Sequence, residues 1–77
     1  MILKDLRYGD IKPGDILCWT TNPDCKITPS SDLVVSVLRS GKNIQFKFFN
    51  LGSQKFWSSR LYHADDTCLQ MIFRAEP

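Results

Sequence analysis

The segment from Asp32 to Ser59 constrains the fold most, because it consists of three apolar runs separated by two short turn signals. Its sequence is DLVVSVLRSGKNIQFKFFNLGSQKFWSS, and it holds five of the nine aromatic residues in the chain. Runs of β-branched and aromatic residues that alternate with period two are typical of β-strands. The segment therefore predicts a meander of three antiparallel strands.

The first turn signal, Ser40-Gly41-Lys42-Asn43, fits a two-residue hairpin loop of type II′ with Gly41 at the first central position. The turn sets the pairing register, in which Ser40 faces Asn43, Val37 faces Phe46 and Val35 faces Phe48. We expect one face of this hairpin to form the core, with Leu33, Val35, Val37, Ile44, Phe46 and Phe48 on it.

The second turn signal, Asn50-Leu51-Gly52, fits a three-residue loop with Gly52 in the left-handed conformation, which places Phe46 opposite Phe56. The other face of the meander then carries Val34, Ser36, Leu38, Gln45, Lys47, Phe49, Lys55 and Trp57, with the two lysines opposed. A two-residue loop would instead shift the register and bring Trp57 into the core in place of Phe56.

The flanking segments supply the remaining elements. Pro13-Gly14 fits a type II turn, and a strand is expected to follow over residues 16–20. Residues 21–31 contain two prolines and predict a long loop, whereas residues 68–73 predict a last strand that pairs with the first. Residues 1–8 fit either an edge strand or a helical turn, and residues 59–66 either a loop or a 3₁₀ turn.

Length and composition indicate one small globular domain over residues 1–77. A chain of 77 residues buries only about 60% of its unfolded surface, and 43% hydrophobic with 23% charged residues is ordinary for a folded protein. No apolar run is long enough to span a membrane or to form a signal peptide. Three cysteines are an odd number, which favours reduced thiols and predicts a cytoplasmic protein without membrane contact.

The strand pattern resembles the SH3-like small β-barrel. The resemblance is carried by the entry Lys12-Pro13-Gly14-Asp15-Ile16-Leu17, by the long loop over residues 21–31 and by the meander over residues 33–59. It implies an all-β fold, a single small five-stranded barrel with a long loop after the first main strand. The acidic loop and paired tyrosines of the peptide-binding signalling domains are not evident, so the resemblance does not extend to proline-rich ligands.

Two groups of residues are of types that could bind a metal or support catalysis. Cys18, Cys25, His63 and Cys68 are of types that bind zinc, but the spacings C-x₆-C and H-x₄-C lack the close cysteine pair of structural zinc sites. We expect no metal and no cofactor, with Cys18 and Cys68 as small buried residues on adjacent strands. His63 with Asp65 and Asp66 could support acid–base chemistry, but a polar turn is the simpler interpretation, and we expect no enzyme.

The candidate binding residues are Lys47, Phe49, Lys55 and Trp57, with Arg60 and Lys42 near their ends. We expect exposed apolar groups on this face to bind a protein partner or a second copy of the chain, as in a small accessory protein of a virus or mobile element. The alternative is a single-stranded nucleic acid, because aromatic rings can stack on bases while lysines neutralise phosphates. Trp57 could also simply cover the open end of the barrel.

Overall fold

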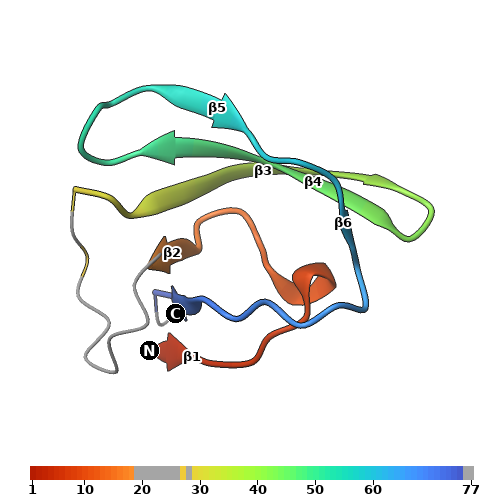
Figure 1. The fold of residues 1–77 in the computed structure, drawn as a ribbon. Coiled ribbons are helices and arrows are strands. Elements are labelled where there is room, and N and C mark those ends of the chain that lie inside the picture. The colour runs from red at the N-terminus through yellow and green to blue at the C-terminus, as the bar shows by residue number, and fades with distance from the viewer. Residues whose placement is uncertain (19–26, 28, 76–77) are drawn as a thin grey trace.

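The computed structural model describes residues 1–18, 27 and 29–75 (Figure 1). These residues form a single antiparallel sheet, and the described helical structure is one short 3₁₀ turn. The elements are β1 (Ile2–Leu3), the 3₁₀ turn η1 (Tyr8–Asp10), β2 (Ile16–Cys18), β3 (Asp32–Ser40), β4 (Asn43–Asn50), β5 (Phe56–Ser58), β6 (Tyr62–His63) and β7 (Met71–Phe73). The all-β prediction is therefore confirmed.

The sheet is strongly bent and its two ends stay apart. The strand order is β1-β7-β2-β3-β4-β5, and β6 pairs with β4. In Figure 1, β3, β4 and β5 form one layer and β2, β7 and β1 form the other, and the chain crosses between the layers through β6. Within the described residues β1 and β5 do not pair, so the sheet is open and is not a closed five-stranded barrel.

The β3–β4 hairpin forms at the predicted turn. Gly41 has a φ of 60°, as the first central position of a type II′ turn requires, and Ser40 faces Asn43. Val37 faces Phe46, also as predicted.

A β-bulge interrupts β3 between Val34 and Ser36 and corrects the predicted register beyond that point. Val34 faces Phe48, Ser36 faces Lys47, and Val35 is the extra residue. Val34 is consequently buried, whereas Val35 is 40% exposed. The predicted pairing of Val35 with Phe48 was wrong, because the bulge reverses the alternation of the first half of the strand.

The β4–β5 turn is longer than predicted, and the pairing of Phe46 with Phe56 was wrong. Phe49 faces Phe56, and Phe48 faces Trp57. The residue with positive φ is Gln54, at 56°, and not the glycine of the turn.

Side-chain hydrogen bonds from Asn50 explain the longer turn. Its Oδ1 accepts hydrogen bonds from the backbone N–H groups of Gly52 and Ser53, at 3.2 and 2.9 Å. The N–H of Gly52 also donates to the carbonyl oxygen of Pro29, at 2.9 Å, and a Cβ on Gly52 would collide with that residue. Glycine is therefore needed for a close approach and not for a left-handed backbone.

The other segments follow the predictions in part. At the Pro13-Gly14 turn, Gly14 has a φ of 95° and the N–H of Asp15 donates to the carbonyl oxygen of Lys12 at 3.1 Å, as a type II turn requires. The last strand, β7, begins three residues later than the predicted range 68–73, but it pairs with β2 as predicted and also with β1. Residues 1–8 begin with a strand and run into the 3₁₀ turn, and residues 59–66 include a strand, β6. Most of the predicted loop, with the end of the predicted strand at residues 19–20, lies outside the described residues.

The core lies between the two layers of the bent sheet. Its buried members are Ile11, Leu17, Val34, Ile44, Phe46, Phe48, Cys68 and Ile72. Leu3, Leu6, Tyr8, Val37 and Tyr62 pack against this cluster while remaining partly exposed. The described part of the chain contains no helix with the length and hydrophobicity that crossing a bilayer requires.

Candidate binding surface

The layer formed by β3, β4 and β5 has an outer face that is turned away from the core. Cross-strand pairing arranges the side chains of this outer face in three rows. The rows are Leu33, Phe49 and Phe56; then Ser36, Lys47 and Ser58; and last Leu38 and Gln45. The exposed bulge residue Val35 lies between the first two rows along β3.

The first row ends in an aromatic pair that a lysine covers. The ring centroids of Phe49 and Phe56 are 5.0 Å apart with an interplanar angle of 53°, which is a favourable tilted arrangement. Lys47 extends from the second row and places its Nζ 5.3 Å from the centroid of Phe56, within the range of a cation–π contact. The two predicted residues Lys47 and Phe49 therefore do lie together, and their neighbour is Phe56.

The outer face is both apolar and positively charged. Leu38 is 64% exposed and Phe56 is 61% exposed. Lys55 precedes Phe56 in the chain and is exposed, but the alternation along β5 puts its side chain on the side of Trp57. The predicted opposition of Lys47 and Lys55 was therefore wrong, and Lys47 faces Ser58 instead. The three rows contain no aspartate or glutamate, and Lys47 is the one charged residue in them.

Trp57 belongs to the opposite side of the layer, which corrects its predicted place. It faces Phe48, its ring centroid lies 4.8 Å from that of Phe48, and its indole Nε1 donates a hydrogen bond to Oδ1 of Asp32 at 2.9 Å. Asp32 is only 3% exposed and also accepts from the side chain of Asn50 at 3.1 Å. Trp57 therefore helps to hold the end of the sheet together, although 41% of it is exposed.

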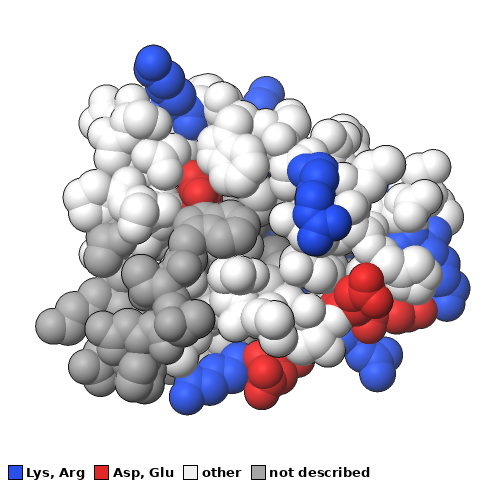
Figure 2. Space-filling view, viewed as in Figure 1, with Lys and Arg blue, Asp and Glu red and all other residues white. Residues whose placement is uncertain are grey.

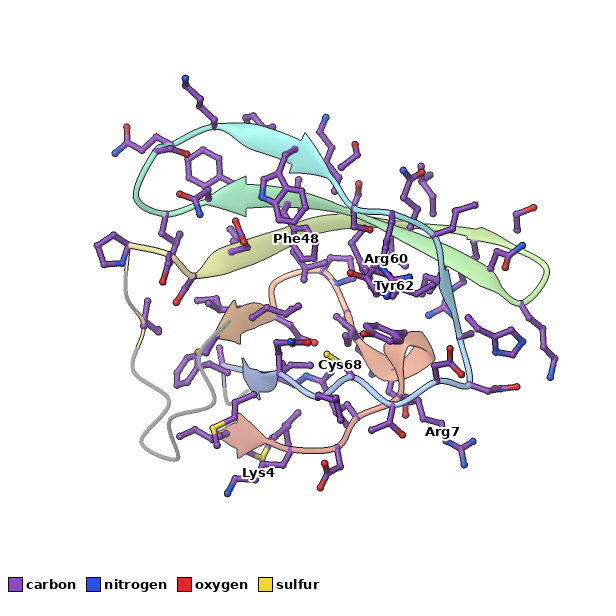
Figure 3. All side chains as sticks on the ribbon, in the orientation of Figure 1. Lys4, Arg7, Phe48, Arg60, Tyr62 and Cys68 are labelled. Atoms are coloured by element: carbon purple, nitrogen blue, oxygen red, sulfur yellow. The ribbon has the colours of Figure 1, made fainter. Side chains whose placement is uncertain are left out.

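Arg60 also lies away from the outer face. Its guanidinium carbon is 4.3 Å from the centroid of Tyr62, whose ring stacks on Tyr8 at 4.1 Å and 20° (Figure 3). Burial raises the pKa of Tyr8 above its ordinary value. Lys42 forms an exposed ion pair with Asp65 at 3.0 Å. These basic residues are thus engaged on other parts of the molecule.

The cysteines and the histidine do not come together in the described structure. Cys18 and Cys68 are both buried, as predicted, but Cys68 precedes β7 and does not lie on a strand. Burial raises the pKa of Cys68. His63 is exposed, and its Nδ1 accepts the N–H of Asp65 at 3.2 Å within a turn. Cys25 lies outside the described residues, and among the described ones no three potential metal ligands form a cluster.

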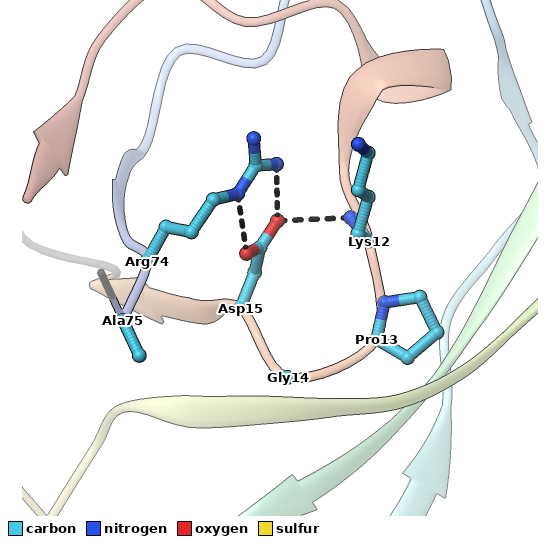
Figure 4. Close-up of a pocket in the computed structure, with 6 residues that line it drawn as sticks. All are labelled: Lys12, Pro13, Gly14, Asp15, Arg74 and Ala75. Carbon is cyan, nitrogen blue, oxygen red and sulfur yellow. Dashed lines mark hydrogen bonds and ion pairs between the residues drawn. The ribbon is translucent and has the colours of Figure 1, made fainter. Parts of the chain in front are cut away.

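A shallow hollow of about 180 Å³ lies beside the Pro13-Gly14 turn (Figure 4). Its lining includes an ion pair in which Arg74 donates from Nε and Nη2 to the two carboxylate oxygens of Asp15, at 2.9 and 2.8 Å. The backbone N–H of Lys12 donates to the same carboxylate at 2.8 Å. Ligand pockets typically exceed about 300 Å³, and the polar groups of this hollow already satisfy one another, so its role is structural.

Figure 2 shows charged side chains of both signs, with acidic and basic groups next to one another along the lower edge of the view. The three rows of the outer face differ from this mixed pattern because Lys47 is their one charged residue. The fold and surface together define an open, antiparallel all-β domain with an apolar, cationic sheet face. No protein-family model, curated protein or solved structure matches this chain.

Sequence reasoning missed Phe56 as an exposed residue of the candidate surface. The missing signal was the length of the β4–β5 turn, which decides which of Phe56 and Trp57 turns outward. Asn50 followed two and three residues later by Gly52 and Ser53 could have indicated it, because an asparagine side chain that accepts from those N–H groups builds a longer turn.

Proposed function

We propose that this chain is a small, non-enzymatic protein-binding module and that its outer face is the binding surface. The proposal rests mainly on the exposed apolar side chains of this single sheet face, above all Phe56 and Leu38. An exposed aromatic ring such as that of Phe56 supports the proposal, because aromatic residues are enriched at the buried centres of protein interfaces.

The charge of the outer face supports a partner that is apolar and acidic. Lys47 lies in the middle row, so a carboxylate of the partner would meet a cation near the centre of the outer face. Opposite charges across an interface accelerate association and exclude wrong partners. Face-to-face association of two copies would bring their Lys47 side chains together, which disfavours self-association through this surface.

The test compares two substitutions of exposed apolar residues. Phe56→Asp changes the outer face, and Leu69→Asp changes a side chain that is 81% exposed elsewhere. We expect immobilised wild-type protein and Leu69→Asp to capture the same protein from cell extract, and Phe56→Asp to lose it. Loss with both variants, or with neither, would contradict the proposal, and light scattering of the pure protein would reveal a dimer instead.

A second candidate function is the binding of single-stranded nucleic acid through the same face. The contact between Lys47 and Phe56 favours it, because a base could stack on the ring while the ammonium neutralises a phosphate. Binding of a fluorescent oligonucleotide should then weaken steeply with salt and with Phe56→Ala, while Trp57→Phe on the other side should bind normally. No binding at low salt would rule this function out.

We also propose that the fold is an open variant of the SH3-like small barrel. The turn and strand at residues 12–17, the meander of β3, β4 and β5, and the pairing of β7 with β2 support this interpretation. An experimental structure would contradict it if the chain order along the sheet differed from β1-β7-β2-β3-β4-β5.

A further inference from the structure

We propose that the free edge of β5 accepts an extended, acidic segment of a partner protein as an additional β-strand. This inference rests on the proposed protein-binding function and specifies how the partner is held. It concerns the backbone of β5, whereas the proposed function concerns the side chains of the outer face, so separate experiments can test the two.

The hydrogen bonds on either side of β5 determine which backbone groups are free. The N–H of Asn50 donates to the carbonyl oxygen of Lys55, and the N–H of Ser59 donates to that of Phe46, both at 2.9 Å. In an antiparallel pair, bonded residues alternate along each strand. Residues 55, 57 and 59 therefore point their backbone groups toward β4, and the backbone groups of Phe56 and Ser58 point away from it.

The edge of β5 lacks the features that natural proteins use to prevent strand addition. Within the described residues β5 pairs only with β4, and its sequence Phe56-Trp57-Ser58 contains no proline, no charge and no bulge. A strand added there would place a side chain roughly 5 Å from Phe56 on the outer face. An apolar side chain at that position would cover a ring that is now 61% exposed.

The charges around β5 select an acidic segment over a second copy of the chain. Residues 55–60 read KFWSSR, so the edge is flanked by a lysine and an arginine with no acidic residue between them. Two such edges would repel each other if they paired. In a segment that places an apolar residue beside Phe56 on the outer face, the neighbouring residues lie on the opposite side of the sheet, where glutamate or aspartate would come close to Lys55, as strand addition with alternating side chains allows.

The experiment begins with selection from a displayed library of random linear peptides on the immobilised full chain. We expect the enriched peptides to alternate apolar and acidic residues. Binding of a synthetic enriched peptide should slow amide hydrogen exchange at Phe56 and Ser58. Lys55→Glu should weaken binding about tenfold or more, because it would place a like charge beside the carboxylates of the peptide, whereas Lys4→Glu, which changes an exposed lysine at the other end of the molecule (Figure 3), should leave binding unchanged.

A backbone variant tests the edge itself. Ser58→Pro removes an N–H that points away from β4, so the native ladder stays intact while strand addition is blocked. We expect it to lose peptide binding with an unchanged circular dichroism spectrum. A second test alters the peptide and leaves the protein unchanged. Two versions of the peptide are made, one methylated at its odd-numbered and one at its even-numbered backbone nitrogens. Only the version whose methyl groups replace the N–H groups that face β5 should fail to bind.

Three results would overturn the inference in distinguishable ways. Peptides that bind without protecting Phe56 and Ser58 from exchange would refute strand addition but leave the outer face as a binding surface. A wild-type dimer that Ser58→Pro converts to a monomer would assign the edge to a second copy. Failure of the library to yield any peptide that depends on Phe56 would refute the inference, whereas the proposed function is refuted separately if Phe56→Asp captures the same protein as the wild type.

Discussion

Replacement of Arg74 by methionine tests the structural role assigned to the ion pair beside the Pro13-Gly14 turn. The substitution keeps most of the length and apolar area of the side chain but removes its two hydrogen bonds to Asp15 and its bond to the carbonyl oxygen of Asp10. The side chain of Asp15 is 3% exposed, so its carboxylate would remain nearly buried with the backbone N–H of Lys12 as its donor.

The expected loss of stability follows from this geometry. Removal of one partner from a buried ion pair costs about 3–5 kcal/mol, but the side chain of Arg74 is 27% exposed, so water can replace part of the lost contact. We therefore expect a loss of about 2–4 kcal/mol. A chain of 77 residues has a total stability of roughly 4–12 kcal/mol, so the variant should lose a substantial share of its free energy of unfolding.

The measurement is urea denaturation followed by circular dichroism, with Arg39→Met as the matched control. Arg39 is exposed and donates a single hydrogen bond, to the carbonyl oxygen of Gly9 at 2.8 Å, so its loss should cost no more than about 1 kcal/mol. The double variant Asp15→Asn with Arg74→Met should be less destabilised than the sum of the single changes, because the two groups interact directly.

Two results would refute this reasoning. A loss below about 1 kcal/mol for Arg74→Met would show that the buried carboxylate does not depend on its partner. Strict additivity of Asp15→Asn and Arg74→Met would show that the bidentate contact contributes no coupling energy.

Three further predictions concern other contacts. Gly52→Ala should cost about 1–3 kcal/mol in urea denaturation because its Cβ would lie 2.9 Å from that of Pro29, whereas Ser53→Ala should change stability by less than about 0.5 kcal/mol. Trp57→Phe should lower the free energy of unfolding by about 1–3 kcal/mol, because it removes a hydrogen-bond donor from buried Asp32. If its free energy of partner binding falls by more than its free energy of unfolding, the assignment of Trp57 to the inner side is contradicted. Burial raises the folded-state pKa of Cys68 above the ordinary 9.0, so the unfolded chain ionises first and stability should fall as the pH rises past that value. Cys68→Ala should show a shallower fall in urea midpoint, and an equal slope in both proteins would contradict the prediction.

The sequence predicted the elements of this fold better than their register. Alternating apolar residues and the Gly41 turn were sufficient for the β3–β4 hairpin near its turn, because a two-residue loop leaves only one register. The bulge at Val35 was not predictable from the pattern. Leu33 to Val35 are three consecutive apolar residues, so the sequence does not show which of them face the core and which face outward. Its position depends on burial of Val34 between the layers, which is a tertiary effect.

The candidate surface was predicted only in part for the same reason. Lys47 and Phe49 follow the alternation of β4, which the hairpin fixes, and both lie on the outer face as expected. The positions of Trp57 and Arg60 depend instead on the length of the second turn and on the path of the chain beyond it. A register shift by an odd number of residues exchanges the two faces of a strand. The longer turn, which the hydrogen bonds of Asn50 stabilise, shifts the partner of Phe56 by three residues, from Phe46 to Phe49.

The extra residue in β3 also determines which deletions this protein can tolerate. Loss of Val35 would restore an unbroken ladder with β4, because Val34 would still face Phe48 and Ser36 would still face Lys47. The segment before the bulge would keep its orientation, so Asp32 would retain its contacts with the indole of Trp57 and the side chain of Asn50. The irregular residue is thus a position at which β3 can be shortened by one residue without exchanging the two faces of the strand.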